Sequence, residues 1–328
     1  MTKQEIAKQE TTELSMSQRF SDAMVKEFQG GVGTVDLTDF QQRLAQNYFI
    51  DIDATLKTAE IARLKKSEKW QDPVPVTWSN IDMNLLSRNL ISYVRIGLDP
   101  AQKNHINAIP FKNNTTQKYD IVFIEGYRGI QLKAEKYGLD IPDAVTVEVV
   151  YSTDKFQAIK KDMQNKVENY VFEITNPFDR GEIVGGFYYH IFNGNPDKNK
   201  LVVFSLKDIL KRKPKYASVE FWGGEKDIWK DGKKTGKKEP TEGWYDRMVY
   251  KTIYRAAYND ITIDSQKIDD DYLRLKQLEV QNTENLVQAE IEEHGNTELV
   301  DFETGEIYEE VEEEIIDEVP IDTEDAGY

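Results

Sequence analysis

The stretch that organises this chain reads Trp244-Tyr245-Asp246-Arg247-Met248-Val249-Tyr250-Lys251-Thr252-Ile253-Tyr254-Arg255-Ala256-Ala257-Tyr258. It contains no proline or glycine and follows directly after Gly243, so it predicts a helix of roughly four turns. Three cations recur at every fourth position and therefore share one ridge of that helix; they are Arg247, Lys251 and Arg255. A second ridge beside it consists of Tyr250, Tyr254 and Tyr258.

The cationic ridge allows two interpretations. Like charges four residues apart repel each other, at roughly 0.2–0.5 kcal/mol per pair. A helix that carries them is favoured when it meets an extended anion such as a phosphate backbone. The alternative is that the cations form a solvated face and the tyrosines belong to the core. The helix alone leaves both interpretations open.

Length and composition bound the class of protein. The chain has 328 residues, enough for one large or two ordinary domains. It contains no cysteine, which excludes disulfides, thiol nucleophiles and cysteine-bound metals and allows a reducing compartment. The first residues lack the apolar segment of a secretory signal, and no apolar run approaches ~18 residues. We therefore expect a soluble protein with no membrane partner.

The formal net charge of -17 is unevenly distributed. Residues 269–328 contain 22 acidic and 2 basic residues, whereas the remainder contains 37 acidic and 40 basic residues. Within that remainder, residues 211–255 have 13 Lys or Arg against 7 Asp or Glu. A basic region therefore adjoins an acidic C-terminal appendage, and the overall charge does not exclude a nucleic-acid ligand.

The periodicity and turn signals predict an α+β fold in which helices pack with antiparallel hairpins. We expect residues 1–15 to be disordered, 16–80 to form a helical region, 81–265 to form the core and 266–328 to be acidic and mostly disordered. Helices are predicted from Ser17 to Gly30, from Thr38, from Asp53 to Trp70 and over 82–97, 125–138, 205–211 and 272–286. Strands are predicted over 106–111, 119–124, 145–151, 167–175, 183–192 and 201–204. Residues 221–243 read as a Gly/Lys loop with a basic hairpin tip.

Recognisable catalytic chemistry is absent from the sequence. The three histidines, His105, His190 and His294, are scattered in unlike contexts and suggest neither a zinc site nor a Ser/His/Asp arrangement. The stretch from Gly232 to Lys238 has the wrong spacing for a nucleotide-binding loop. We therefore expect no enzyme, no ATP, and Mg²⁺ at most as a counterion of DNA.

Two ordered blocks of the sequence together carry a family resemblance. The first comprises Leu98-Asp99-Pro100, Ile109-Pro110-Phe111 and Ile121-Val122-Phe123-Ile124-Glu125-Gly126-Tyr127-Arg128-Gly129-Ile130-Gln131-Leu132, similar to the signature "L-x-P … PF … GYKG-(I/L)-x-x-L". The second is Trp244 followed by residues 248–255, similar to "W … M-x-x-K-T-x-x-R". In this order the two blocks resemble the RecT family of phage single-strand annealing proteins, and the resemblance covers roughly residues 82–263. Arg128 stands where lysine is commoner, and Asn259-Asp260-Ile261-Thr262 replaces the usual Leu-Pro ending.

The resemblance implies an ATP-independent recombinase that coats single-stranded DNA and promotes its pairing with a complementary strand. It implies a mixed α+β core with a basic DNA-binding groove around residues 81–265, and assembly into rings or filaments. Partners implied are single-stranded DNA and the annealed duplex, further copies of the chain, a partner exonuclease and the host single-strand binding protein. The expected location is the cytoplasm of a bacterial host, as a phage or prophage protein.

The resemblance also implies roles for particular residues. One wall of the groove is expected to carry Arg247, Lys251 and Arg255, and the other Arg128, Lys133 and Lys136. Amides at the helix entry near Arg128 could also face a phosphate. Tyr127 and Gln131 are expected to touch sugar or base, although Tyr127 could equally be a packing residue. A possible DNA-contacting loop contains Lys233, Lys234, Lys237 and Lys238, which could instead be a solubilising tip.

Alternatives remain for the tail and for the function. The acidic tail either competes with DNA for the basic groove or presents an acidic and hydrophobic motif to the exonuclease or the host single-strand binding protein. The rival function is an oligomeric structural or assembly protein with no specific DNA role. A weaker possibility is a nuclease with unrecognised carboxylates.

Overall fold

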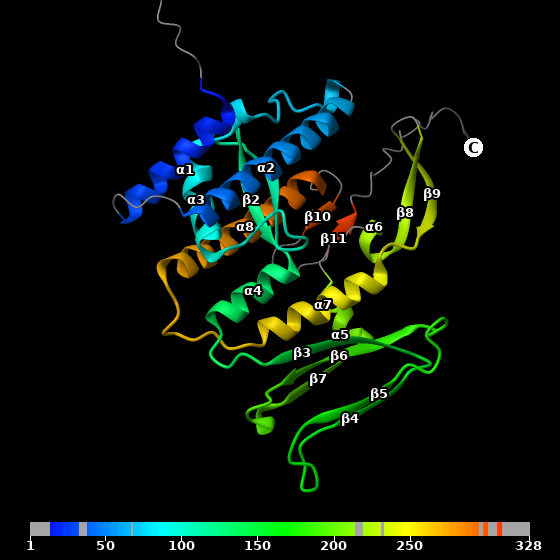
Figure 1. Ribbon diagram of the computed structural model, residues 1–328. Helices are drawn as coiled ribbons and strands as arrows, with labels where there is room; N and C mark the ends of the chain where they lie inside the picture. The colour runs from blue at the N-terminus through cyan, green and yellow to red at the C-terminus, as the bar shows by residue number, and fades with distance from the viewer. Residues whose placement is uncertain are drawn as a thin grey trace, which may run out of the picture. The chain divides into compact units, whose positions relative to one another are not determined.

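A computed structural model describes residues 14–32, 38–66, 68–213, 219–230, 233–294, 298–300 and 307–309. The chain divides into two compact units, residues 1–282 and 283–328. The first is a mixed α+β structure with small antiparallel sheets (Figure 1), which confirms the predicted fold class. Within the described part of the chain, no helix is both long and apolar enough to span a membrane.

The N-terminal part of the first unit is helical. It contains α1 (Met16–Val32), α2 (Asp39–Lys65), α3 (Met83–Ile96) and two short 3₁₀ turns, η1 (Glu68–Trp70) and η2 (Trp78–Asn80). Thr38 begins α2 with a capping box, as predicted, and Asp82 caps α3, which ends at Gly97 with a φ of 97°. Two boundaries differ from the prediction, because α1 continues through Gly30 and Gly31, and α2 continues past Asp53.

Asp53 does not begin a new helix because its carboxylate is used inside α2. It accepts hydrogen bonds from the Lys57 ammonium (2.6 Å) and the Trp78 indole (3.0 Å). Ser15 and not Ser17 caps α1, since its hydroxyl accepts from the Gln18 amide. The predicted disorder of residues 1–15 concerns a segment of which residues 1–13 lie outside the described residues.

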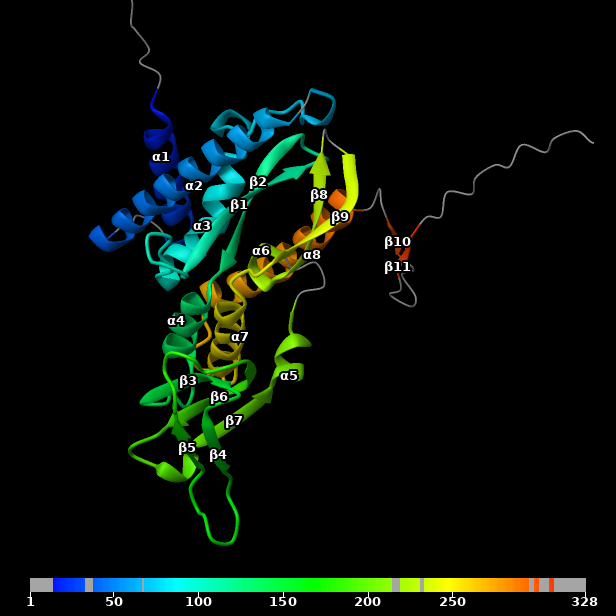
Figure 2. The ribbon, with the colours of Figure 1, turned by 90° about the vertical axis from the view of Figure 1, so that its right-hand side faces the viewer.

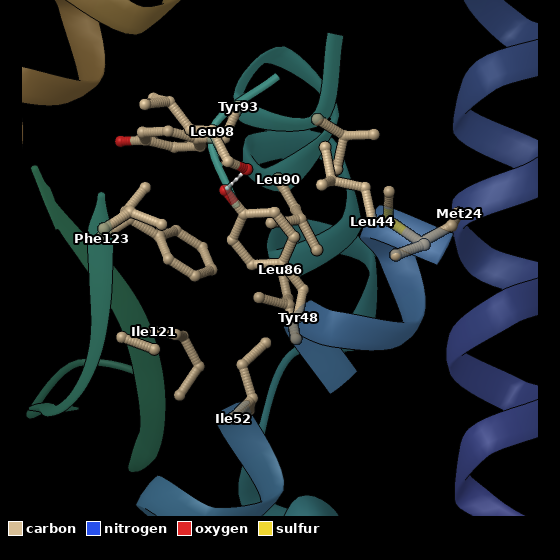
Figure 3. Close-up of a cluster of buried hydrophobic side chains, with 14 of the residues drawn as sticks. Met24, Leu44, Tyr48, Ile52, Leu86, Leu90, Tyr93, Leu98, Ile121 and Phe123 are labelled. Carbon is tan, nitrogen blue, oxygen red and sulfur yellow. Dashed lines mark hydrogen bonds between the residues drawn. The ribbon is translucent and has the colours of Figure 1, made fainter. Parts of the chain in front are cut away.

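The core of the helical part forms where α2 and α3 meet a hairpin (Figure 3). The Tyr48 hydroxyl donates a 2.8 Å hydrogen bond to the carbonyl oxygen of Leu98, so the buried phenol is satisfied. The Tyr48 ring also meets Phe123 edge-on, with their centroids 5.5 Å apart. This core holds the hairpin and the loop after Leu98 against the helices, which positions the segment that follows.

The hairpin consists of β1 (Ile106–Asn113) and β2 (Lys118–Glu125), and α4 (Tyr127–Tyr137) follows immediately. The glycines at the start of α4 allow a close approach to the loop at Asn104 and His105. A Cβ on Gly126 would lie 2.0 Å from the Asn104 carbonyl oxygen, and one on Gly129 would lie 2.2 Å from that of His105. The absence of a side chain at these two glycines therefore lets the first turn of α4 pack directly against the loop.

The central sheet has the strand order β3-β6-β7, formed by β3 (Ala144–Tyr151), β6 (Ile183–Ile191) and β7 (Lys200–Ser205). A second hairpin, β4 (Lys155–Ile159) and β5 (Asn169–Glu173), packs its aromatic residues against Phe187 on one face of the sheet. Strand β4 was absent from the sequence prediction. A 3₁₀ turn, η3 (Pro196–Lys198), joins β6 to β7.

The opposite face of the sheet is covered by α7 (Tyr245–Asn259) and α5 (Leu206–Leu210) (Figures 1 and 2). Helix α7 confirms the predicted organising helix, and it buries Val249, Ile253 and Ala257. Gly186 of β6 permits this packing, because a Cβ there would lie 2.3 Å from Cδ1 of Ile253.

Residues 219–230 and 233–241 contain more regular structure than the predicted Gly/Lys loop. They form α6 (Val219–Trp222) and a hairpin of β8 (Gly224–Lys230) with β9 (Lys233–Thr241), which agrees with the predicted hairpin. Residues 231–232 of its tip lie outside the described residues. Gly223 and Gly243 both have positive φ, and a Cβ on Gly243 would lie 2.4 Å from the Gly223 amide nitrogen. Their contact closes the base of this hairpin beside the start of α7.

Helix α8 (Asp270–His294) follows, and its residues up to 282 belong to the first unit. Its Leu275 and Leu278 are buried in the helical core, together with Tyr272. In the second unit, β10 (Glu298–Val300) pairs with β11 (Ile307–Glu309). The predicted disorder of the acidic tail otherwise concerns residues 295–297, 301–306 and 310–328, which lie outside the described residues.

Candidate nucleic-acid interface

The cationic ridge of α7 faces away from the sheet. Val249, Ile253 and Ala257 point into the sheet, and the cations lie two residues earlier, roughly 200° around the helix. Arg247 and Arg255 are exposed and Lys251 is half-buried. The helical period thus places all three cations on the side that the core does not use.

Two adjoining hollows lie along this ridge, and we call them together the cation cleft. The first has a volume of about 620 Å³ and is lined by Arg247 and Lys251 of α7. The second has about 560 Å³ and extends the cleft to Arg255. Both hollows share four lining residues, which are Asn104, Tyr127, Met248 and Lys251.

Six cations line the cation cleft without a carboxylate partner among the described residues. They are Lys103, Arg128, Arg212, Arg247, Lys251 and Arg255. A seventh, Arg180, is neutralised by Asp154 at 2.5 Å. Unpaired cations on a concave surface raise the local concentration of polyanions, so the cation cleft is suited to a phosphate backbone.

The acidic side chains of the cation cleft reduce this charge only in part. Asp246 and Glu148 line its first hollow. Burial raises the pKa of Glu148, although the neighbouring Arg180 opposes that rise. Glu125 lines the second hollow, but it is buried and paired with Lys133. The balance of the exposed side chains remains positive.

The tyrosine ridge of α7 forms the seam with α4. The Tyr254 hydroxyl donates a 2.6 Å hydrogen bond to Oε1 of Gln131, and the Tyr254 ring meets that of Tyr127 at 4.9 Å. Tyr258 is buried, and Tyr250 is 36% exposed at the open end of the ridge. The tyrosines of α7 therefore pack, as the second interpretation predicted, and the outward-facing cations fit both a phosphate contact and a solvated face.

Arg128 and Tyr127 lie in the cation cleft as expected, whereas Lys133 and Lys136 do not. Lys133 is 7% exposed and pairs with Glu125 and Glu279, because its position on α4 faces the core. Lys136 is exposed, but its ammonium donates to the Arg95 carbonyl oxygen on the α3 side. The second wall of the cleft therefore has fewer of the predicted cations.

The amides at the entry of α4 are also already used. The Arg128 amide donates to the Asn104 carbonyl oxygen at 3.1 Å, and the Gly126 amide donates to that of His105 at 2.9 Å. A phosphate at this helix end would have to displace these bonds, so the expected contribution of these amides to an anion site is not supported.

The predicted lysine loop is part of the β8–β9 hairpin. Lys237 and Lys238 are exposed on β9, and the Lys238 ammonium lies 3.5 Å from the Glu225 carboxylate. The side chains of Lys233 and Lys234 lie outside the described structure. Of the two lysines whose side chains are described, Lys237 and Lys238, neither lines a hollow of the cation cleft.

Three residues of the cation cleft that could contact DNA were not selected from the sequence as site residues. Lys103 comes from the loop before β1, Arg212 from the turn after α5, and Trp244 from the residue before α7. Trp244 is 58% exposed and the Arg247 guanidinium lies 5.3 Å from its ring centre. The place of Trp244 in the second sequence block was a usable signal, and Arg212 lies in the basic run Lys211-Arg212-Lys213, whereas the single Lys103 offered no signal.

Comparison with known proteins identifies one family. The family model described as the RecT family matches residues 86–287. This range includes α4, α7 and every residue that lines the cation cleft. No curated protein and no solved structure matches the chain.

Proposed function

Because the chain belongs to the RecT family, we propose that it anneals complementary DNA strands in phage-type recombination without ATP or a covalent catalytic site. It acts as an oligomeric ring or filament on DNA in the cytoplasm of a bacterial host. It works beside a partner exonuclease and the host single-strand binding protein. No cofactor takes part, and Mg²⁺ acts at most as a counterion.

The observation that carries this proposal is the row of unpaired cations in the cation cleft. Annealing requires neutralisation of backbone phosphates while the Watson–Crick edges of the bases stay accessible. Arg247, Lys251 and Arg255 lie at successive turns of α7, about 6 Å apart along the helix axis. That spacing is close to the distance between consecutive phosphates of a single strand. The ridge can therefore contact successive phosphates and leave the bases free.

Aromatic side chains supply the second element of single-strand binding. Tyr127 borders both hollows, and the exposed ring of Trp244 lies at the end of the ridge. Stacking of a base on such a ring contributes about 1–3 kcal/mol and tolerates any sequence. A sequence-tolerant contact is what a protein needs when it anneals arbitrary complementary strands.

The acidic C-terminal region is proposed either to regulate DNA binding or to recruit a partner protein. As a polyanion it competes with DNA for the cation cleft, or it binds the exonuclease or the single-strand binding protein through its apolar residues. Removal of residues 295–328 separates the two roles. Tighter DNA binding supports competition, and unchanged DNA binding with loss of the partner supports recruitment.

The proposal is tested by annealing of two complementary labelled oligonucleotides without ATP or added metal, with an unrelated pair as the control. The full-length protein should accelerate only the complementary pair. Lys251→Ala combined with Arg255→Ala should abolish the acceleration, whereas Lys136→Ala should retain it. No acceleration at any salt concentration would favour the assembly protein, and degradation of the strands with Mg²⁺ or Mn²⁺ would favour a nuclease.

A further inference from the structure

Helix α2 carries apolar side chains on two opposite faces. Its inner face buries Leu44, Tyr48, Ile52 and Leu56 in the helical core. Its outer face exposes a second apolar set, in which Ile50 is 64%, Ile61 56% and Leu64 58% exposed. A surface helix ordinarily has a single apolar stripe, so the second one indicates a contact with another molecule.

The spacing of the outer set identifies the kind of partner. Residues 50, 54, 57, 61 and 64 alternate steps of four and three, which is the seam of a helix that packs against another helix. We call these five residues the α2 stripe. It is about 21 Å long, since each helical residue advances 1.5 Å. Its centre is Lys57, the only charged member.

A matching surface lies on α8. Leu273 and Val280 are 52% and 60% exposed and stand seven residues apart, with the exposed Gln277 between them. We call these three residues the α8 stripe. The opposite face of α8 buries Leu275 and Leu278 in the core. Like α2, this helix therefore has an apolar seam on the side that its own fold leaves open.

The charges at the two stripes are complementary. The exposed Lys65 and Lys66 follow the α2 stripe at the C-terminal end of its helix. The exposed Asp269 and Asp270 precede the α8 stripe at the N-terminal end of its helix. In an antiparallel arrangement these lysines meet these aspartates, and the helix dipoles are also opposed favourably.

We propose that the α2 stripe of one copy packs antiparallel against the α8 stripe of a second copy. This inference rests on the proposed function, because it names the contact through which the protein coats DNA. A twofold contact between two α2 stripes is disfavoured, since it would bury the Lys57–Asp53 ion pairs of both copies at its centre. A contact between two different surfaces leaves one stripe free on each end, so it repeats into a ring or a filament.

The test uses two complementary full-length variants. Ile61→Asp with Leu64→Asp blocks the α2 stripe, and Leu273→Lys with Val280→Lys blocks the α8 stripe. The control is Val171→Asp on β5, a residue that is 53% exposed and lies outside both stripes. Masses are measured by native mass spectrometry with and without a single-stranded oligonucleotide, and circular dichroism verifies that each variant is folded.

Wild type and the Val171→Asp control should form oligomers, and each blocked variant alone should be monomeric. An equimolar mixture of the two blocked variants should form pairs and nothing larger, because each retains the stripe that the other lacks. Oligomers of either blocked variant alone, a mixture that stays monomeric, or a monomeric wild type in both conditions would overturn the inference. Because mass is the readout, a failure of annealing leaves this result interpretable, and a failure of assembly leaves DNA contact in the cleft unaffected.

Discussion

The Lys133 ammonium of α4 lies 2.5 Å from Oε2 of Glu125 of β2, and both side chains are buried. The same ammonium also pairs with Glu279 of α8. One lysine therefore joins α4 and the preceding strand β2 to the distant helix α8, and its partner Glu125 lines the second hollow of the cation cleft. Glu279 also pairs with Lys276, so Lys133 is shared between two carboxylates and, among the described residues, Glu125 depends on it alone.

Replacement of Lys133 should destabilise the fold. Lys133→Met leaves the buried Glu125 without a cation, whereas Glu279 keeps its ion pair with Lys276. Removal of one partner of a buried pair costs about 3–5 kcal/mol. The free energy of unfolding should fall by about that amount in urea denaturation. Lys136→Met, three residues later on the exposed side of α4, should change it by less than about 0.5 kcal/mol. Equal stability of the two variants would contradict a structural role for Lys133.

The free energy of unfolding should depend on pH through the titration of Glu125. Burial, with a further contribution from Glu279, raises the pKa of Glu125 to about 7, against the opposing effect of Lys133. Its ordinary value is 4.5. Between these pH values the folded state binds more protons than the unfolded state. The contribution of Glu125 to the free energy of unfolding is therefore fully present below pH 4.5 and is lost as the pH rises to about 7.

The measurement is the free energy of unfolding of wild type and Glu125→Gln at several values of pH. The difference between them should decline by at most about 1.4 kcal/mol per pH unit over this interval. Glu279 titrates in the opposite sense, because Lys133 and Lys276 lower its pKa in spite of burial. Its contribution is lost only as the pH falls below its ordinary value. A difference that stays constant from pH 4.5 to 7 would refute the assignment.

The cations that the structure brings into the cleft should contribute to DNA binding irrespective of their place in the sequence. Lys103→Ala, Arg212→Ala and Lys251→Ala should each weaken binding of unrelated single strands to a similar degree. Each should reduce the slope of log affinity against log salt by roughly one. Fluorescence anisotropy over a salt series measures both quantities. The surface residue Lys136→Ala should leave the slope unchanged, and a reduced slope there would place DNA elsewhere.

The close approach at the entry of α4 should make Gly129 intolerant of any side chain. Gly129→Ala places a Cβ 2.2 Å from the His105 carbonyl oxygen, so the loop or the helix must shift. Such overpacking typically costs about 1–3 kcal/mol. Thermal unfolding should therefore show a lowered midpoint, together with weaker DNA binding because Arg128 moves with the helix. Gly194→Ala, where no atom lies within 4 Å of the added Cβ, should match wild type.

The family motifs and the local periodicity supplied much of the fold in advance. The Asp82 cap and Gly97 predicted α3, and two extended runs joined by a polar loop predicted the β1–β2 hairpin. Strand β4 was not predicted because its five residues, Lys155–Ile159, include only two large apolar side chains. The break expected at Asp53 failed because a residue that can cap a helix can equally serve within one as an ion-pair partner.

The sequence by itself determined that residues 245–259 form a helix with cations on one ridge and tyrosines on the next, because helical periodicity is a local property. Tertiary structure alone decided which cations reach the cleft. Lys133 and Arg128 lie five residues apart on the same helix, yet Glu279 of α8 pairs with the first, whereas the second lines the cation cleft. Lys103 and Arg212 joined the site only through folding. Which neighbour covers a helix face depends on packing between distant segments, and no local pattern records it.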